Sequence, residues 1–284
     1  MQSIVLATHG GVSSDGAVRV ASLLAARLRV PLIPLVVYAP IRVVDYGFGA
    51  TYIPSAEDEA AVETALVESV TEQLRRCEIS SPAPAARTGI IPAEIAALAR
   101  AEGAGLIVTG LGAHSIVDRT LGGETALHLA QDAMAPVLAV PASATAIPRR
   151  VIAAIDFSAT SVLAARTAAG WLRAGDELHL VSVAPKPRRS DRAVPAIQPV
   201  VDRLTKAGEE LGVAPGVRVQ STGVFGDPAR TLLDHAQRID ADLIALGSHG
   251  YGAVKRLVVG SVASKIIRVA TCAVLVAPIG CLET

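Results

Sequence analysis

The chain has 284 residues, of which 51% are hydrophobic and 3% aromatic, and its formal net charge is zero. A core built from Ala, Val, Leu and Ile favours an α/β protein, and the neutral balance gives no support to electrostatic binding of nucleic acid or anionic membrane. The three cysteines show no CxxC spacing and no apolar run reaches the length of a membrane span. We therefore expect a soluble cytoplasmic protein without a disulfide framework or zinc site.

The first half of the chain alternates aliphatic runs with helical periodicity. Its predicted strands are residues 4–8, 31–38, 87–91, 106–109 and 137–140. Its predicted helices are residues 17–28, a long helix capped by Ser55, residues 93–101 with Pro92 in the first turn, and a helix that ends at Asp132. A loop over residues 39–54 precedes the long helix.

The same order repeats after a linker of small residues at 141–148. The predicted strands are residues 151–155, 177–184, 217–222, 243–246 and 273–277, and the predicted helices are residues 161–172, 200–211, 228–238 and 262–270. A basic loop at 185–199 is interpreted as a solvated connection. The order predicts two tandem doubly wound domains, residues 1–145 and 149–284, each with a five-stranded parallel sheet flanked by helices.

A glycine-bearing loop follows the fourth strand of the second half. It reads Gly247-Ser248-His249-Gly250, then nine residues, then Gly260-Ser261, directly before a predicted helix. A helix start presents unpaired N–H groups and a partial positive charge, and glycines let the backbone close on an anion. The loop is therefore a candidate phosphate site, in which Ser261 can cap the helix and donate its hydroxyl to a phosphate oxygen.

Asp156 ends the first strand of the second half. In an open α/β sheet the ligand crevice lies at the carboxyl ends of the strands, where the winding reverses. If the fourth strand lies next to the first, Asp156 and the glycine loop face one crevice, and the carboxylate could accept hydrogen bonds from ribose hydroxyls or the adenine amine. The alternative interpretation is that Asp156 merely caps the first helix and that Gly247 and Gly250 serve a tight turn.

These residues carry a resemblance to the universal stress protein family. The signature Gly-x-x-Gly, nine residues, Gly-Ser is complete in Gly247, Gly250, Gly260 and Ser261, and the last strand closes on Val-Leu-Val-Ala-Pro. The resemblance covers both halves, so the chain looks like a tandem member. It implies an α/β fold related to adenine nucleotide α-hydrolases, bound ATP or another adenine nucleotide, and pairing of domains, with a homodimer, through the terminal strands.

The resemblance also implies roles for individual residues. Asp156 would meet adenine or ribose, and Val183 would line the adenine pocket. The ribose and phosphates would be surrounded by Gly247, His249, Gly250, Gly260, Ser261 and Val262. Gly226, which opens the third helix of the second half, is carried over by position as well. Family members are usually binding or signalling proteins in stress and dormancy, and any hydrolysis of ATP is slow.

The first half departs from this pattern at the informative positions. His9 stands where Asp156 stands, Ala113 replaces the second glycine, and Glu124 replaces Ser261. A carboxylate at a helix start would repel phosphate by roughly a few kcal/mol in a partly desolvated site. We therefore expect the first half to hold no ATP, or something less anionic.

Three functions remain open from the sequence. The first is a non-enzymatic ATP-binding stress protein with its nucleotide in the second half. The second is a weak ATP hydrolase with bound Mg²⁺ or Mn²⁺ as electrophile, for which no general base can be named. The third is a nucleotide-free scaffold whose last strands pair domains and chains.

Overall fold

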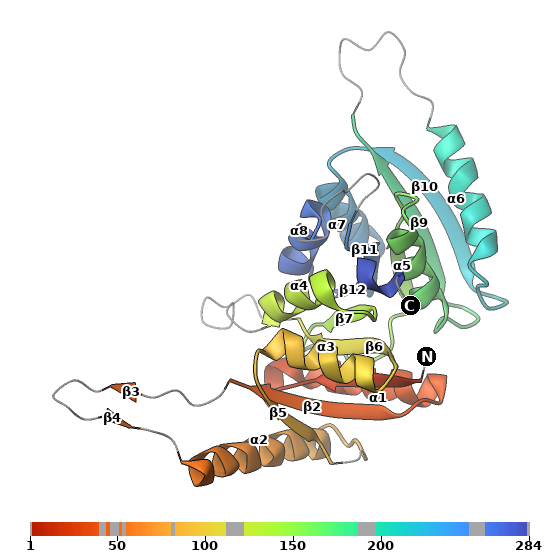
Figure 1. Ribbon diagram of the computed structural model, residues 1–284. Helices are drawn as coiled ribbons and strands as arrows, with labels where there is room; N and C mark the ends of the chain where they lie inside the picture. Colours follow the sequence, from red (N-terminus) through yellow and green to blue (C-terminus); the bar gives the residue numbers. More distant parts are fainter. Residues whose placement is uncertain are drawn as a thin grey trace.

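The first half of the chain contributes five strands to the main sheet in the computed structural model, which describes residues 2–39, 44–45, 51–52, 55–80, 83–111, 122–186, 197–249 and 259–282 (Figure 1). The strands are β1 (Ser3–Ala7), β2 (Leu32–Tyr38), β5 (Ala85–Thr88), β6 (Ala104–Gly110) and β7 (Val137–Val140). The helices are α1 (Asp15–Leu28), α2 (Ala56–Arg76), α3 (Ile91–Ala101) and α4 (Gly122–Asp132), and a 3-10 turn, η1 (Val12–Ser14), precedes α1.

The second half repeats this order. Its strands are β8 (Arg150–Ala154), β9 (Glu177–Ala184), β10 (Arg218–Phe225), β11 (Leu243–Gly247) and β12 (Ala273–Ala277). Its helices are α5 (Ala159–Ala169), α6 (Gln198–Glu210), α7 (Pro228–Ile239) and α8 (Ser261–Val269), and a 3-10 turn, η3 (Ile279–Leu282), follows the last strand.

The ten strands form one sheet in the order β10-β9-β8-β11-β12-β7-β6-β1-β2-β5. Within each half the neighbouring strands are parallel, and the fourth strand lies beside the first. The winding therefore reverses next to β1 in the first half and next to β8 in the second, as expected for doubly wound domains. The predicted α/β fold is confirmed.

The two halves meet through their last strands. β7 and β12 pair in antiparallel fashion, with Leu138 opposite Leu275, so the domain pairing implied by the resemblance occurs within one chain. Each of these strands is also paired on its other side, β7 with β6 and β12 with β11. A homodimer through the same strands would therefore have to displace this junction.

Helices cover both faces of the sheet, and the apolar cores continue across the junction. One cluster packs residues of α1, α2, α5 and α6 against strands of both halves, including Leu138 and Leu275. On the other face, a cluster joins Ala126 and Ala130 of α4 to residues of α7 and α8. Arg27 of α1 donates to the carbonyl oxygen of Trp171 at 2.9 Å, so a polar contact also links the halves.

Several element boundaries differ from the sequence predictions. The loop predicted at residues 39–54 contains a two-stranded hairpin, β3 (Val44–Asp45) and β4 (Thr51–Tyr52). The third strand of the first half lies at Ala85–Thr88 rather than at 87–91, and that of the second half continues to Phe225 rather than ending at 222. Most of the basic loop, residues 187–196, lies outside the described residues.

The long helix α2 begins as expected. The Ser55 hydroxyl accepts the N–H of Asp58 at 3.2 Å, and the Asp58 carboxylate accepts the N–H of Ser55 at 2.8 Å, which is a complete capping box. Three acidic residues occupy its first turn and two arginines its last turn, in the sense that the helix dipole favours. Within the described part of the chain, no helix combines the length and the apolar character needed to cross a membrane.

Candidate functional site

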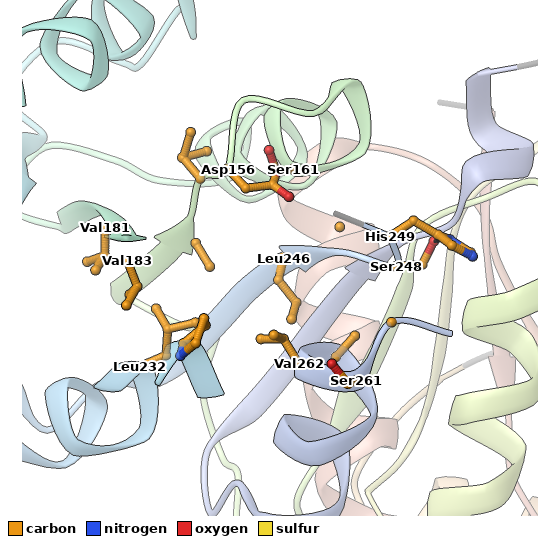
Figure 2. A pocket seen from close by; sticks show the side chains of 16 residues that line it. Asp156, Ser161, Val181, Val183, Leu232, Leu246, Ser248, His249, Ser261 and Val262 are labelled. Carbon is orange, nitrogen blue, oxygen red and sulfur yellow. Dashed lines mark hydrogen bonds between the residues drawn. The ribbon is translucent and has the colours of Figure 1, made fainter. Parts of the chain in front are cut away.

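A cavity of about 250 Å³ lies at the carboxyl ends of β8 and β11, between the starts of α7 and α8. Figure 2 shows the side chains that line it. One wall is apolar and is formed by Val181, Val183, Leu232, Leu246 and Val262. The polar lining consists of Asp156, Ser161, Ser248, His249 and Ser261. The topology thus brings Asp156 and the glycine loop to one crevice, as the sequence predicted for neighbouring first and fourth strands.

Asp156 follows β8 and is exposed. Its Oδ1 accepts the N–H of Ser158 at 3.0 Å. The N-cap of α5 is Ser158, whose hydroxyl accepts the N–H of Ser161 at 3.2 Å. The alternative in which Asp156 itself caps this helix is therefore wrong, and the carboxylate is instead part of a turn at the mouth of the cavity.

The residue after Asp156 has an unusual backbone conformation. Phe157 has a φ of 65°, which is rare for a bulky side chain, and the guanidinium of Arg203 on α6 lies 3.8 Å from the centre of its ring. The corresponding residue of the first half, Gly10, has a φ of 83°. The turn that carries Asp156 is therefore a shared feature of both halves.

The glycine loop is closed by backbone hydrogen bonds at its two ends. The N–H of Gly260 donates to the carbonyl of Ser248 at 2.7 Å, and the N–H of Ser248 donates to the carbonyl of Ala277 at 3.0 Å. A Cβ at Gly247 would collide with Thr160, and one at Gly260 would lie 3.0 Å from the carbonyl oxygen of Ser248. Both glycines line the cavity, and both are also required by the close approach of neighbouring backbone or side chains.

The start of α8 faces the cavity. Gly260, rather than Ser261, is the N-cap, so the expectation that Ser261 caps this helix is wrong. Ser261 is the first helical residue and is exposed. Ser261, Val262 and Ala263 all line the cavity, and N–H groups in a first turn have no intrahelical acceptor. This helix end can therefore bind an anion with backbone donors and the Ser261 hydroxyl.

His249 lines the cavity and also makes contacts that fix the loop. Its Nδ1 lies 2.9 Å from the Ser248 hydroxyl oxygen, and Figure 2 shows its ring directed away from Val183 and Leu232. Its Nε2 is buried, and no hydrogen-bond partner for that atom occurs among the described residues. Its carbonyl accepts the Thr160 hydroxyl at 3.1 Å, which holds the loop against α5.

One predicted site residue does not line the cavity, and a second is not among the described residues. Gly226 does not line it. Its N–H donates to the carbonyl of Ala184 at 2.9 Å, and a Cβ there would collide with the Thr231 hydroxyl, so this glycine serves the turn between β10 and α7. Gly250 lies outside the described residues.

Sequence reasoning missed part of the apolar wall. Val181 lies two residues before Val183 on the same strand and hence on the same face, so the alternation of β9 could have found it. Pro228 and Leu232 line the cavity from α7. The helical spacing of Leu232 marks a buried position, but no pattern distinguishes a residue that faces a cavity from one that faces the core.

The corresponding region of the first half is organised differently. The Nδ1 of His9 accepts the N–H of Gly11 at 3.1 Å, so this ring takes part in its own turn. The buried Thr8 donates to Gln73 at 2.7 Å, and Gln73 in turn donates to Asp15 at 3.0 Å. Glu124 is exposed in the first turn of α4, whereas Ala113 lies outside the described residues.

Metal-ligating side chains do not cluster in the part of the chain that the structure describes. No group of three or more His, Cys, Asp or Glu side chains that could hold a metal ion occurs there. Burial raises the pKa of Cys272 to about 11 and that of Cys281 to about 12, which keeps both as thiols near neutral pH.

Comparisons with known proteins agree with the fold and with the repeat. The family model described as "Universal stress protein family" matches residues 1–141 and 148–278. Universal stress protein YxiE of Bacillus subtilis is 31% identical over 74 residues, which cover 26% of this chain and 50% of that protein. The chain spans about half the length, or less, of the curated relatives that it matches.

A solved structure shares this fold along almost the whole chain. A universal stress protein from Archaeoglobus fulgidus aligns with 97% of this chain and 96% of its own, with a TM-score of 0.66 and 19% identity, which shows the fold alone. A universal stress protein in complex with cAMP aligns with 46% of this chain and 97% of its own, with a TM-score of 0.36 and 19% identity. Because the family model matches nearly the whole chain in two successive copies, the chain belongs to the universal stress protein family.

Proposed function

We propose that the chain is a non-enzymatic, adenine nucleotide-binding stress protein that holds ATP in its second half. The observation that carries this proposal is that Asp156, the apolar wall with Val183, and the start of α8 all line the same cavity. The apolar wall suits a purine ring, the carboxylate suits ribose hydroxyls or the adenine amine, and the helix start suits phosphate.

The size of the cavity suggests how ATP would lie. Its volume, about 250 Å³, lies slightly below that of most small-molecule sites, which begin at roughly 300 Å³. Adenine and ribose would occupy the cavity, and the phosphates would extend over the exposed Ser261 at its edge. In this arrangement the phosphates, with any Mg²⁺ or Mn²⁺ that accompanies them, remain near solvent.

The first half would contribute structure rather than a second nucleotide site. His9 in place of Asp156 removes an acceptor for ribose, and the exposed Glu124 places a negative charge in the first turn of α4. The favourable helix end of the second half becomes unfavourable for phosphate here. We therefore propose a stoichiometry of one ATP per chain.

Isothermal titration of the intact chain with ATP tests this proposal. We expect one site per chain, an affinity that falls in Asp156→Ala, and an unchanged affinity in the matched variant His9→Ala. Two sites per chain, or equal effects of both substitutions, would contradict the asymmetry. The absence of heat and of a thermal shift at millimolar ATP would favour the scaffold, and ATP turnover that survives repurification but disappears in Ser261→Ala would favour the hydrolase.

A further inference from the structure

An ion pair joins the two helices that border the cavity. The Nζ of Lys265 on α8 lies 3.5 Å from Oδ1 of Asp227, which is the N-cap of α7. Pro228, next to Asp227, and Ser261, one turn before Lys265, both line the cavity. Figure 2 shows Leu232 of α7 and Val262 of α8 on the same side of the pocket. The pair therefore lies at the rim, between the starts of the two helices.

Asp227 has a second partner that does not depend on Lys265. Its Oδ1 accepts the N–H of Arg230 at 2.9 Å. This backbone hydrogen bond, with a further contribution from Lys265, lowers the pKa of the Asp227 carboxyl below its usual value, so Asp227 is charged at neutral pH. If Lys265 moved away, Asp227 would keep its capping contact and much of its solvation.

Lys265 can exchange its partner at little cost. The side chains of Lys265 and Asp227 are 54% and 59% exposed, and exposed ion pairs stabilise a protein very little because water and salt screen both charges. The side chain of a helical residue leans toward the N-terminus of its helix. The Lys265 stem is thus directed toward the turn that begins at Ser261, where the proposed function places phosphate.

We propose that Lys265 makes this site prefer nucleoside di- and triphosphates over monophosphates, by leaving Asp227 for the terminal phosphates at the rim of the cavity. The inference rests on the proposed nucleotide site and adds its phosphate selectivity. A single phosphate is met by the N–H groups at the start of α8, whereas a longer tail brings further negative charge past the rim. The Lys265 ammonium pairs with that added negative charge. When no longer phosphate chain is bound, Asp227 holds the ammonium in place.

The test compares the dissociation constants of ATP and AMP for the intact chain, at low salt and constant Mg²⁺. In Lys265→Gln we expect the ATP constant to rise about five-fold, as for loss of one partly exposed charge contact, while the AMP constant changes less than about two-fold. Arg268→Gln, which removes an equal charge from an exposed position on the same helix, should leave both constants nearly unchanged. Lys265→Arg should retain the preference for ATP.

Asp227→Asn should change the ATP affinity in the opposite direction. Asn keeps the N-cap of α7 but removes the negative charge that competes for Lys265, so ATP should bind about two-fold more tightly and AMP should not. Equal effects of Lys265→Gln on ATP and AMP, or no effect on ATP, would overturn the selectivity while leaving the nucleotide site intact. If neither nucleotide binds the unsubstituted chain, the proposed function fails and the selectivity fails with it.

Discussion

Truncation of Leu138 in the first half should lower the unfolding midpoint that Trp171 reports from the second half. Leu138 lies opposite Leu275 across the β7–β12 junction, and both side chains are fully buried. Trp171, the single tryptophan, is 1% exposed and belongs to the same apolar cluster. If that cluster unfolds as a unit, a destabilising substitution on one side of the junction must also lower the unfolding midpoint reported from the other side.

The expected loss of stability follows from the complete burial of Leu138. Leu→Ala at a fully buried position costs about 2–5 kcal/mol, because a cavity remains where the side chain was. With a urea dependence of about 3 kcal/mol per molar, Leu138→Ala should lower the midpoint by about 1 M. Leu23→Ala, at a large exposed side chain of α1, should change stability by less than about 0.5 kcal/mol.

The assay is urea denaturation followed by tryptophan fluorescence and by far-ultraviolet circular dichroism on the same samples. We expect coincident transitions by both probes, shifted together in Leu138→Ala. Fluorescence that keeps its original midpoint while circular dichroism shows a separate, earlier transition would refute the reasoning, because the two halves would then unfold independently.

Three further predictions concern local features of the chain. Gly10→Ala should destabilise the protein by more than Gly212→Ala. Both glycines have positive φ, but a Cβ at Gly10 would collide with Ser69, whereas a Cβ at Gly212 would have open space around it. Equal shifts in melting temperature would contradict this. Burial, with the nearby Arg238 and His179, lowers the pKa of His235 in the folded state. The unfolded state therefore binds the proton more readily, and the unfolding free energy and melting temperature should fall as pH drops through about 6.5. His235→Gln should make the melting temperature less dependent on pH, and His128→Gln, at an exposed position, should not. Ser55→Ala should cost about 1 kcal/mol, since it removes one side of the capping box of α2; a loss below about 0.3 kcal/mol in urea denaturation would show that the cap is not needed.

The alternation of aliphatic runs and helical periodicity was enough to predict the fold. It predicted the repeat and the parallel pairing within each half. It also predicted that site residues would gather at the carboxyl ends of β8 and β11, because the position of a switch point follows from strand order. Asp156, Val183, Gly247, Gly260 and Val262 line one cavity. Whether they bind a nucleotide stays a prediction.

Boundaries failed where tertiary packing overrides local pattern. The third strand of the second half was predicted to end at residue 222, yet β10 continues to Phe225 because it pairs with β9 along its whole length, with Phe225 opposite Ala184. In the first half the apolar pair at 90–91 was read as part of a strand, but Ile90 is 75% exposed and Ile91 begins α3. The direction of the His249 ring depends on contacts that no sequence spacing encodes.

The most direct test of the central claim is a crystal structure of the intact chain soaked with ATP. The account predicts a nucleotide whose base contacts Val183, whose ribose lies near Asp156, and whose phosphates meet the start of α8. It also predicts no nucleotide beside His9 and Glu124 at the same concentration. A nucleotide bound in the first half, in both halves, or in neither at saturating ATP would contradict the account.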